Sequence, residues 1–150
     1  MNVTPVGGKS PDSTLLGISV DNNGNLVTKK SWDNEPIRLY EMTELVTTKD
    51  TIRPDAISVD DCGAFSLRIY NTTNVSYKIG FYSDVTSNRY ALTDMYDNPH
   101  QFEVSSDTDF VTVTPDDMPI LNWIRNVRLY ILPQGIPTTG SLIIWLVKKK

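Results

Sequence analysis

The sequence predicts an all-β protein built as a single β-sandwich, and its composition is the first reason. The 150 residues include 13 Val, 12 Ile and 16 Thr, but only 3 Ala, 4 Glu and 2 Gln. Branched side chains fit the pleated surface of a sheet, whereas the scarce residues are among the better helix formers. The second reason is a series of short apolar segments separated by turn residues, which is typical of sandwiches.

Residues 1–14 are expected to form an extended N-terminal arm, and residues 15–150 the sandwich domain. The arm is rich in Gly, Pro and Ser and has only Val3 and Val6 as apolar anchors, too few to nucleate a packed segment. We expect it to be mobile in an isolated subunit. It could become ordered by adding main-chain hydrogen bonds along the sheet edge of a neighbour.

The first ordered unit after the arm is predicted to be a hairpin. Two apolar segments, 15–20 and 26–30, flank a turn that contains Asn23-Gly24, and Asn-Gly tolerates the positive φ of tight hairpin turns. A short strand is expected next at residues 37–42.

The clearest alternation lies in residues 65–70 and 75–82, which predicts two strands that each have one apolar face. If they pair directly, the connection must have odd length, either 72–74 or 70–74, for the apolar sets to share a face. The shorter loop would place Arg68 opposite Lys78, so the longer one is favoured. If the strands lie in different sheets, no register follows.

Residues 83–101 form the longest expected loop, and four further strands follow it. Residues 116–123 could form one helical turn, and Pro119 limits the length of any helix there. The last strand is apolar on both faces, which predicts that the domain's own loops or another subunit cover it. About eight short strands favour a jelly roll. The four strands are expected at 102–104, 110–114, 124–132 and 141–148.

Catalytic and metal-binding chemistry has few candidates in this chain. His100 is the one histidine and Cys62 the one cysteine, and neither lies in a recognisable nucleophile or zinc motif. The pairs Asp60-Asp61 and Asp116-Asp117 could ligate calcium, but loop aspartates are common because they bond the backbone. We therefore predict no catalytic residue, no metal site and no cofactor.

Charge and hydropathy restrict the partners. The formal net charge is −4 and the pI about 4.9, which disfavours a nucleic-acid footprint. The longest apolar run, 142–147, is far shorter than the ~20 residues of a membrane-spanning helix, so no membrane partner is expected. The first residues lack the pattern of a secretion signal, which predicts that the protein is made in a cytoplasm and stays there.

Aromatic residues on the polar sides of the strands are the remaining signal for binding. Tyrosine and arginine are enriched at protein interfaces, and exposed tyrosines also stack on sugars. We favour a protein interface over a sugar site. The candidate residues are Tyr70, Tyr82, Tyr130, Arg68, Arg128 and, on the second face of the last strand, Trp145.

Two stretches carry a resemblance. The arm ending in residues 7–10 (GGKS), followed by residues 15–27 (LLGISVDNNGNLV), resembles the opening of many small structural proteins of tailed-bacteriophage virions. The following domain resembles the jelly rolls used as capsid decoration proteins and as tail or fibre modules. The second half also resembles a carbohydrate-binding module, in which a strand such as 140–147 closes the sandwich.

The resemblance implies a non-enzymatic virion structural protein that decorates or stabilises a capsid through protein contacts. It implies a major capsid or tail protein as a partner. Further copies of the chain are expected because the last strand, 142–147, is apolar on both faces, and a trimer is the expected homo-oligomer. The alternative is a viral or cellular carbohydrate-binding module that stacks glycans on Tyr70, Tyr82 or Tyr130.

Overall fold

The computed structural model describes residues 19–20, 22–23, 26–27, 35–42, 49–83 and 90–149. The chain divides into two compact units, Met1–Ser31 and Trp32–Lys150. Antiparallel strands dominate the described residues, which confirms the all-β prediction. The arm predicted at residues 1–14 lies outside the described part.

The first unit contains the predicted hairpin. Strand β1 (Ser19–Val20) pairs antiparallel with β2 (Leu26–Val27), and Ser19 lies opposite Val27. The antiparallel pairing of these two strands confirms the predicted hairpin.

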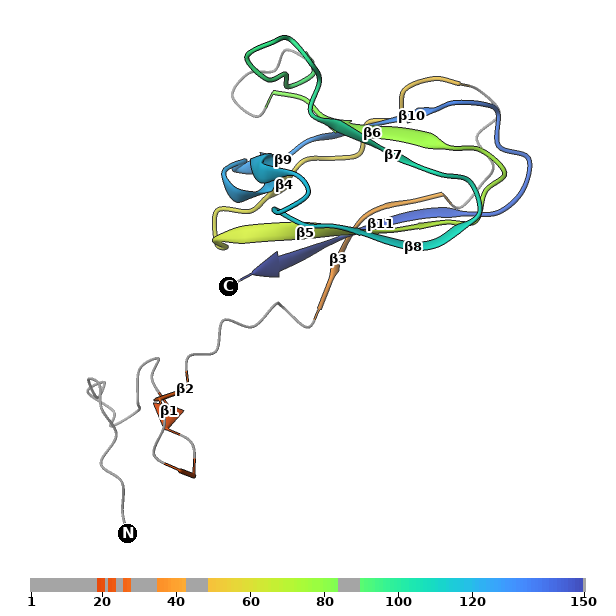
Figure 1. Cartoon of the computed structure of the whole chain (residues 1–150). Helices are drawn as coiled ribbons and strands as arrows, with labels where there is room; N and C mark the ends of the chain where they lie inside the picture. The colour runs from red at the N-terminus through yellow and green to blue at the C-terminus, as the bar shows by residue number, and fades with distance from the viewer. Residues whose placement is uncertain are drawn as a thin grey trace. The chain divides into compact units, whose positions relative to one another are not determined.

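The second unit contains a four-stranded antiparallel sheet in the order β3-β11-β5-β8 (Figure 1). Its central pair joins residues far apart in the sequence, since Ile144 lies opposite Ile69 and Leu146 opposite Leu67. In β5 the side chains of Phe65, Leu67 and Ile69 are buried, as the alternation in residues 65–70 predicted. The strands are β3 (Ile37–Glu41), β11 (Leu142–Lys149), β5 (Ala64–Asn71) and β8 (Thr108–Val113).

A three-stranded sheet has the order β10-β6-β7, formed by β10 (Leu129–Pro133), β6 (Tyr77–Phe81) and β7 (Gln101–Val104). Beside it, β4 (Ile57–Ser58) pairs with β9 (Asn126–Val127), and Ile52 forms a bridge with Ile131. The single strand expected at 124–132 is therefore split at residue 128, because β9 and β10 have different partners.

The strands β5 and β6 lie in different sheets, so the register argument for direct pairing does not apply. Arg68 lies opposite Trp145 and Thr112, and Lys78 lies opposite Leu132 and Glu103. The connection between the strands crosses from one sheet to the other.

Asn71 ties this crossover to the rest of the fold. Its fully buried carboxamide donates to the carbonyls of Val75 (3.1 Å) and Ser105 (2.8 Å). Its Oδ1 accepts bonds from the backbone and hydroxyl of Thr73, at 3.0 and 2.8 Å. These bonds satisfy buried polar groups that would otherwise destabilise the corner.

The two sheets lie one over the other in Figure 1, and their facing side chains form one hydrophobic core. A 3₁₀ helix, η1 (Pro119–Asn122), adds Ile120 and Leu121 to this core. It is the single helical turn expected between residues 116 and 123, with Pro119 where its missing N–H costs no bond. The core includes Leu67, Ile69, Leu142, Ile144 and Leu146 of the larger sheet and Tyr77, Ile79, Phe81, Leu129 and Ile131 of the smaller.

Candidate protein-contact surface

An aromatic cluster lies on the outer side of the four-stranded sheet. The ring centroids of Tyr70 and Phe110 are 5.3 Å apart, and those of Phe110 and Trp145 are 6.2 Å apart with an interplanar angle of 24°. Phe110 is 65% exposed, while Tyr70 and Trp145 are half-buried. With Arg68 and Ile143, these residues form what we call the aromatic face.

Strand register assembles this face from three strands. Ile143 lies opposite Tyr70, and Trp145 lies opposite Arg68. The pairing of β5 with β8 shifts by one residue after Ile69, so that residues 109 and 110 both lie opposite Tyr70. Such bulges redirect side chains, and here the bulge accompanies the contact between Phe110 and Tyr70.

The aromatic face carries basic groups. Arg68 is exposed at its centre, between Trp145 on β11 and Thr112 on β8. At the neighbouring edge strand, Arg38 lies opposite Trp145 and forms an ion pair with Glu41. Aromatic rings beside guanidinium groups are typical of interface hot spots.

The structure brings together three of the six residues singled out from the sequence, Arg68, Tyr70 and Trp145, on this face. The other three, Tyr82, Arg128 and Tyr130, belong to the smaller sheet or its flanks. Their backbones are joined where the amide of Tyr82 donates to the carbonyl of Arg128 at 3.1 Å. The predicted residues therefore form two separate groups.

Packing within the chain occupies the tyrosines of the second group. Tyr82 is only 8% exposed, with the guanidinium carbon of Arg53 5.8 Å from its ring centroid. Tyr130 crosses Gly80, and its hydroxyl donates to Oε1 of Gln101 at 3.0 Å. Partial burial raises the pKa of Tyr130. Neither ring presents an open platform comparable to Phe110.

Phe110 is the residue that the sequence reasoning missed. It was placed in a strand, but its direction was not considered. Val111 and Val113 face inward beside Ile69 and Leu67. Phe110 directly precedes Val111, and two adjacent residues of a strand point to opposite faces. Because Val111 and Val113 face inward, Phe110 could have been identified as an outward-facing aromatic residue.

A second exposed apolar feature follows β6. Isolated bridges join Tyr82 to Ala91 and Thr93 to Pro99, and we call residues 93–99 the Met95 turn. Met95 is 87% and Tyr96 76% exposed at its tip. The expected long loop 83–101 is thus ordered over residues 90–100, while 84–89 lie outside the described residues.

Asp94 holds this turn together. Its Oδ1 accepts bonds from the backbone amides of Tyr96 (2.8 Å) and Asn98 (2.9 Å), and the Asn98 side chain bonds both carboxylate oxygens. These bonds, chiefly those from Asn98, lower the pKa of Asp94. Asp97 adopts a positive φ of 66°, a conformation that Asp tolerates better than most residues.

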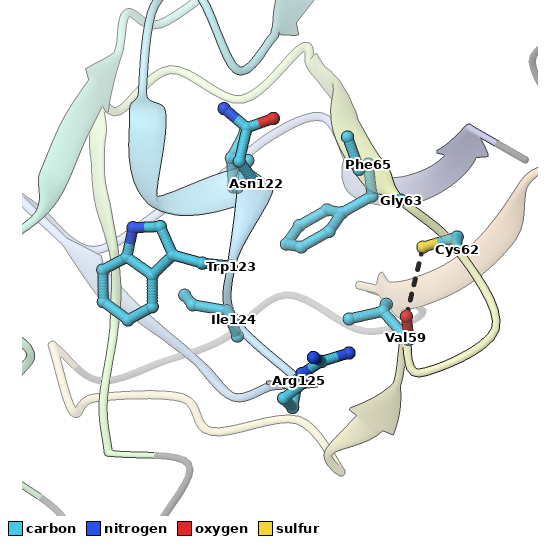
Figure 2. A pocket seen from close by; sticks show the side chains of 10 residues that line it. Val59, Cys62, Gly63, Phe65, Asn122, Trp123, Ile124 and Arg125 are labelled. Carbon is cyan, nitrogen blue, oxygen red and sulfur yellow. Dashed lines mark hydrogen bonds between the residues drawn. The ribbon is translucent and has the colours of Figure 1, made fainter.

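A cleft of about 290 Å³ lies between residues 59–65 and 121–125 (Figure 2). Most of its apolar lining belongs to buried core residues such as Phe65 and Ile124. The thiol of Cys62 donates to the Val59 carbonyl at 3.3 Å, and burial raises its pKa, the opposite of an activated nucleophile. Figure 2 shows the Trp123 indole extending away from Cys62 and Val59.

Within the described ranges, no three His, Cys, Asp or Glu side chains gather closely enough to hold a metal ion. The same residues contain no helix long and apolar enough to span a membrane. No family model, curated protein or solved structure matches this chain.

Proposed function

We propose that this chain is a non-enzymatic structural protein of a tailed-bacteriophage virion that works through protein–protein contacts, as a capsid decoration protein does. The observation that carries the proposal is the aromatic face, where Tyr70, Phe110 and Trp145 lie in contact around Arg68. Phe110 is 65% exposed beside the half-buried rings of Tyr70 and Trp145, and aromatic residues with arginine are enriched where proteins bind each other.

The strand pairing supports the finer assignment of a jelly-roll sandwich. The pairs are nested: β3 with β11, residues 52–58 with 126–131, β5 with β8, and β6 with β7. Nested antiparallel pairs are those of one long hairpin whose two arms run side by side. The additional pairing of β11 with β5 and of β10 with β6 joins parts of this hairpin that are not nested partners, so the hairpin is folded over into two sheets. Jelly rolls occur in viral capsid and lectin domains, so the surface, and not the fold, must decide the function.

A carbohydrate-binding module is the second candidate. The exposed ring of Phe110 beside Tyr70 favours it, since a sugar ring could stack there. Against it, Tyr82 and Tyr130, two of the three tyrosines expected to stack saccharides, are engaged within the chain. We therefore place the protein interface first.

The test is to quantify this chain in purified phage particles by mass spectrometry and to repeat the measurement with Phe110→Ser. Ile136→Ser is the matched control, because Ile136 is another exposed apolar side chain outside the aromatic face. We expect a fixed copy number for the natural chain and the control, and loss of the Phe110 variant. Absence of the chain from particles, together with glycan-array binding that Phe110→Ser abolishes, would replace the proposal with the carbohydrate module.

A further inference from the structure

We propose that the aromatic face is occupied by the Met95 turn of a second copy of this chain. The inference rests on the proposed function in one respect, namely that the aromatic face is a protein-contact surface. It adds the identity of the partner and the segment that docks.

The Met95 turn has the properties of an insertion element. Met95 and Tyr96 are the two most exposed of the large apolar side chains described, yet the backbone beneath them is fixed by the Asp94 bonds and the bridge from Thr93 to Pro99. A segment that is ordered before binding loses less conformational entropy on docking. Methionine adapts to irregular surfaces, and tyrosine is a frequent hot-spot residue.

Charge indicates which surface receives this turn. The turn carries the carboxylates of Asp94 and Asp97, whereas the aromatic face has the exposed guanidinium of Arg68 at its centre. Arg38 at the edge is paired with Glu41, so Arg68 is the basic group that a carboxylate of the turn would meet. Asp94 is used within its own turn, so exposed Asp97 is the carboxylate that can approach Arg68 of the second copy. Two carboxylates at the tip also disfavour insertion into an anionic lipid surface.

Geometry requires that the contact form between copies. The turn follows β6 of the smaller sheet, and the aromatic face is the outer side of the larger sheet. Figure 1 shows residues 90–100 at the far side of the smaller sheet from β5, β8 and β11. A turn of one copy therefore meets the face of another. Two copies that exchange turn and face reciprocally form a closed twofold dimer, whereas a contact that is not reciprocated closes into a ring or continues as a filament. The trimer expected from the sequence would be the smallest ring of the second kind.

Analytical ultracentrifugation of the full chain tests this contact, at concentrations up to roughly 100 µM, which covers the micromolar affinities of ordinary interfaces. The turn variant is Met95→Ser with Tyr96→Ser, and the face variant is Phe110→Ser with Arg68→Asp. We expect the natural chain and the Ile136→Ser control to assemble, and each variant alone to lose roughly 30-fold or more in association constant. A mixture of the two variants should form dimers and nothing larger, because each supplies the half that the other lacks.

Charge removal provides a second test that does not depend on removing apolar groups. Arg68→Asp alone should weaken assembly, and adding Asp97→Asn in the same chain should recover part of it by removing the new repulsion. Asparagine tolerates the positive φ of position 97, so the turn itself is kept. Circular dichroism and thermal melting establish that each variant is folded. A monomeric natural chain, a variant mixture that stays monomeric, or no recovery with Asp97→Asn would overturn the inference. If the monomeric chain is still incorporated into particles and lost on Phe110→Ser, the proposed function stands and only the second copy is excluded.

Discussion

Replacing Gly80 with alanine is predicted to destabilise the fold because the Tyr130 ring lies across this glycine. A Cβ at position 80 would be 2.3 Å from both Cζ and the hydroxyl oxygen of Tyr130, and 2.7 Å from Cε1. These separations are shorter than any tolerated contact, so Gly80→Ala must displace the ring. Displacement breaks the 3.0 Å bond from Tyr130 to Gln101.

The expected magnitude combines two losses and one gain. The hydrogen bond contributes about 0.5–1.5 kcal/mol, and forcing a side chain out of place costs about 1–3 kcal/mol. Replacing glycine with alanine restores about 0.4–1 kcal/mol by restricting the unfolded chain. We expect Gly80→Ala to lower the free energy of unfolding by about 0.5–4 kcal/mol, measured by urea denaturation.

A double-mutant cycle separates the clash from a general intolerance of alanine. In a Tyr130→Ala background the ring is gone, so Gly80→Ala should become neutral or slightly stabilising. Tyr130→Phe is the matched control for the hydrogen bond, with an expected loss of about 1 kcal/mol. An equal loss from Gly80→Ala in both backgrounds would refute the reasoning, because it would show that the ring is not the cause.

Three further predictions follow from single contacts. Asn71→Ala should lower the free energy of unfolding by about 3 kcal/mol in urea titrations, because it leaves several buried partners unsatisfied; a loss below about 1 kcal/mol would contradict the role of this corner. The pKa of Asp94 is lowered in the folded chain. The ionised carboxylate therefore stabilises the Met95 turn at pH values above 3.8, the ordinary pKa of Asp, and this stabilisation is lost as the pH falls through the lowered pKa of the folded chain. The protection factor of the Asn98 amide, which is the ratio of the intrinsic to the observed hydrogen-exchange rate by NMR, should therefore fall as the pH drops below 3.8 and in Asp94→Ala at neutral pH, and an unchanged protection factor in Asp94→Ala would count against the turn bonds. Cys62→Ala and His100→Ala should leave assembly and particle incorporation intact, and the raised pKa of the Cys62 thiol predicts slow alkylation at neutral pH compared with a free cysteine peptide. Rapid alkylation, or a folded variant that no longer assembles, would show that one of these groups has a function.

Alternation along a strand is a local property, and it was readable from the sequence. The pattern in residues 65–70 identified the inward set Phe65, Leu67 and Ile69, and all three are buried. The doubly apolar last strand and the hairpin at residues 19–27 were likewise predicted from neighbouring residues. These features depend only on the face of the strand to which each side chain points. Successive side chains of a strand point to opposite faces, so neighbouring residues in the sequence determine that face.

Tertiary structure alone decided which strands and side chains meet. The chain order suggested that β5 and β6 could pair, but β5 lies between β11 and β8, where Ile69 lies opposite Ile144 on one side and Val111 on the other. Tyr82 sits on the polar side of its alternation and is still buried, since Arg53 covers it. Phe110 reaches Tyr70 through a shift in register between strands distant in sequence. Alternation along a strand determines the face to which a side chain points. Whether that side chain is buried depends on segments from elsewhere in the sequence, and the packing of the whole core places those segments.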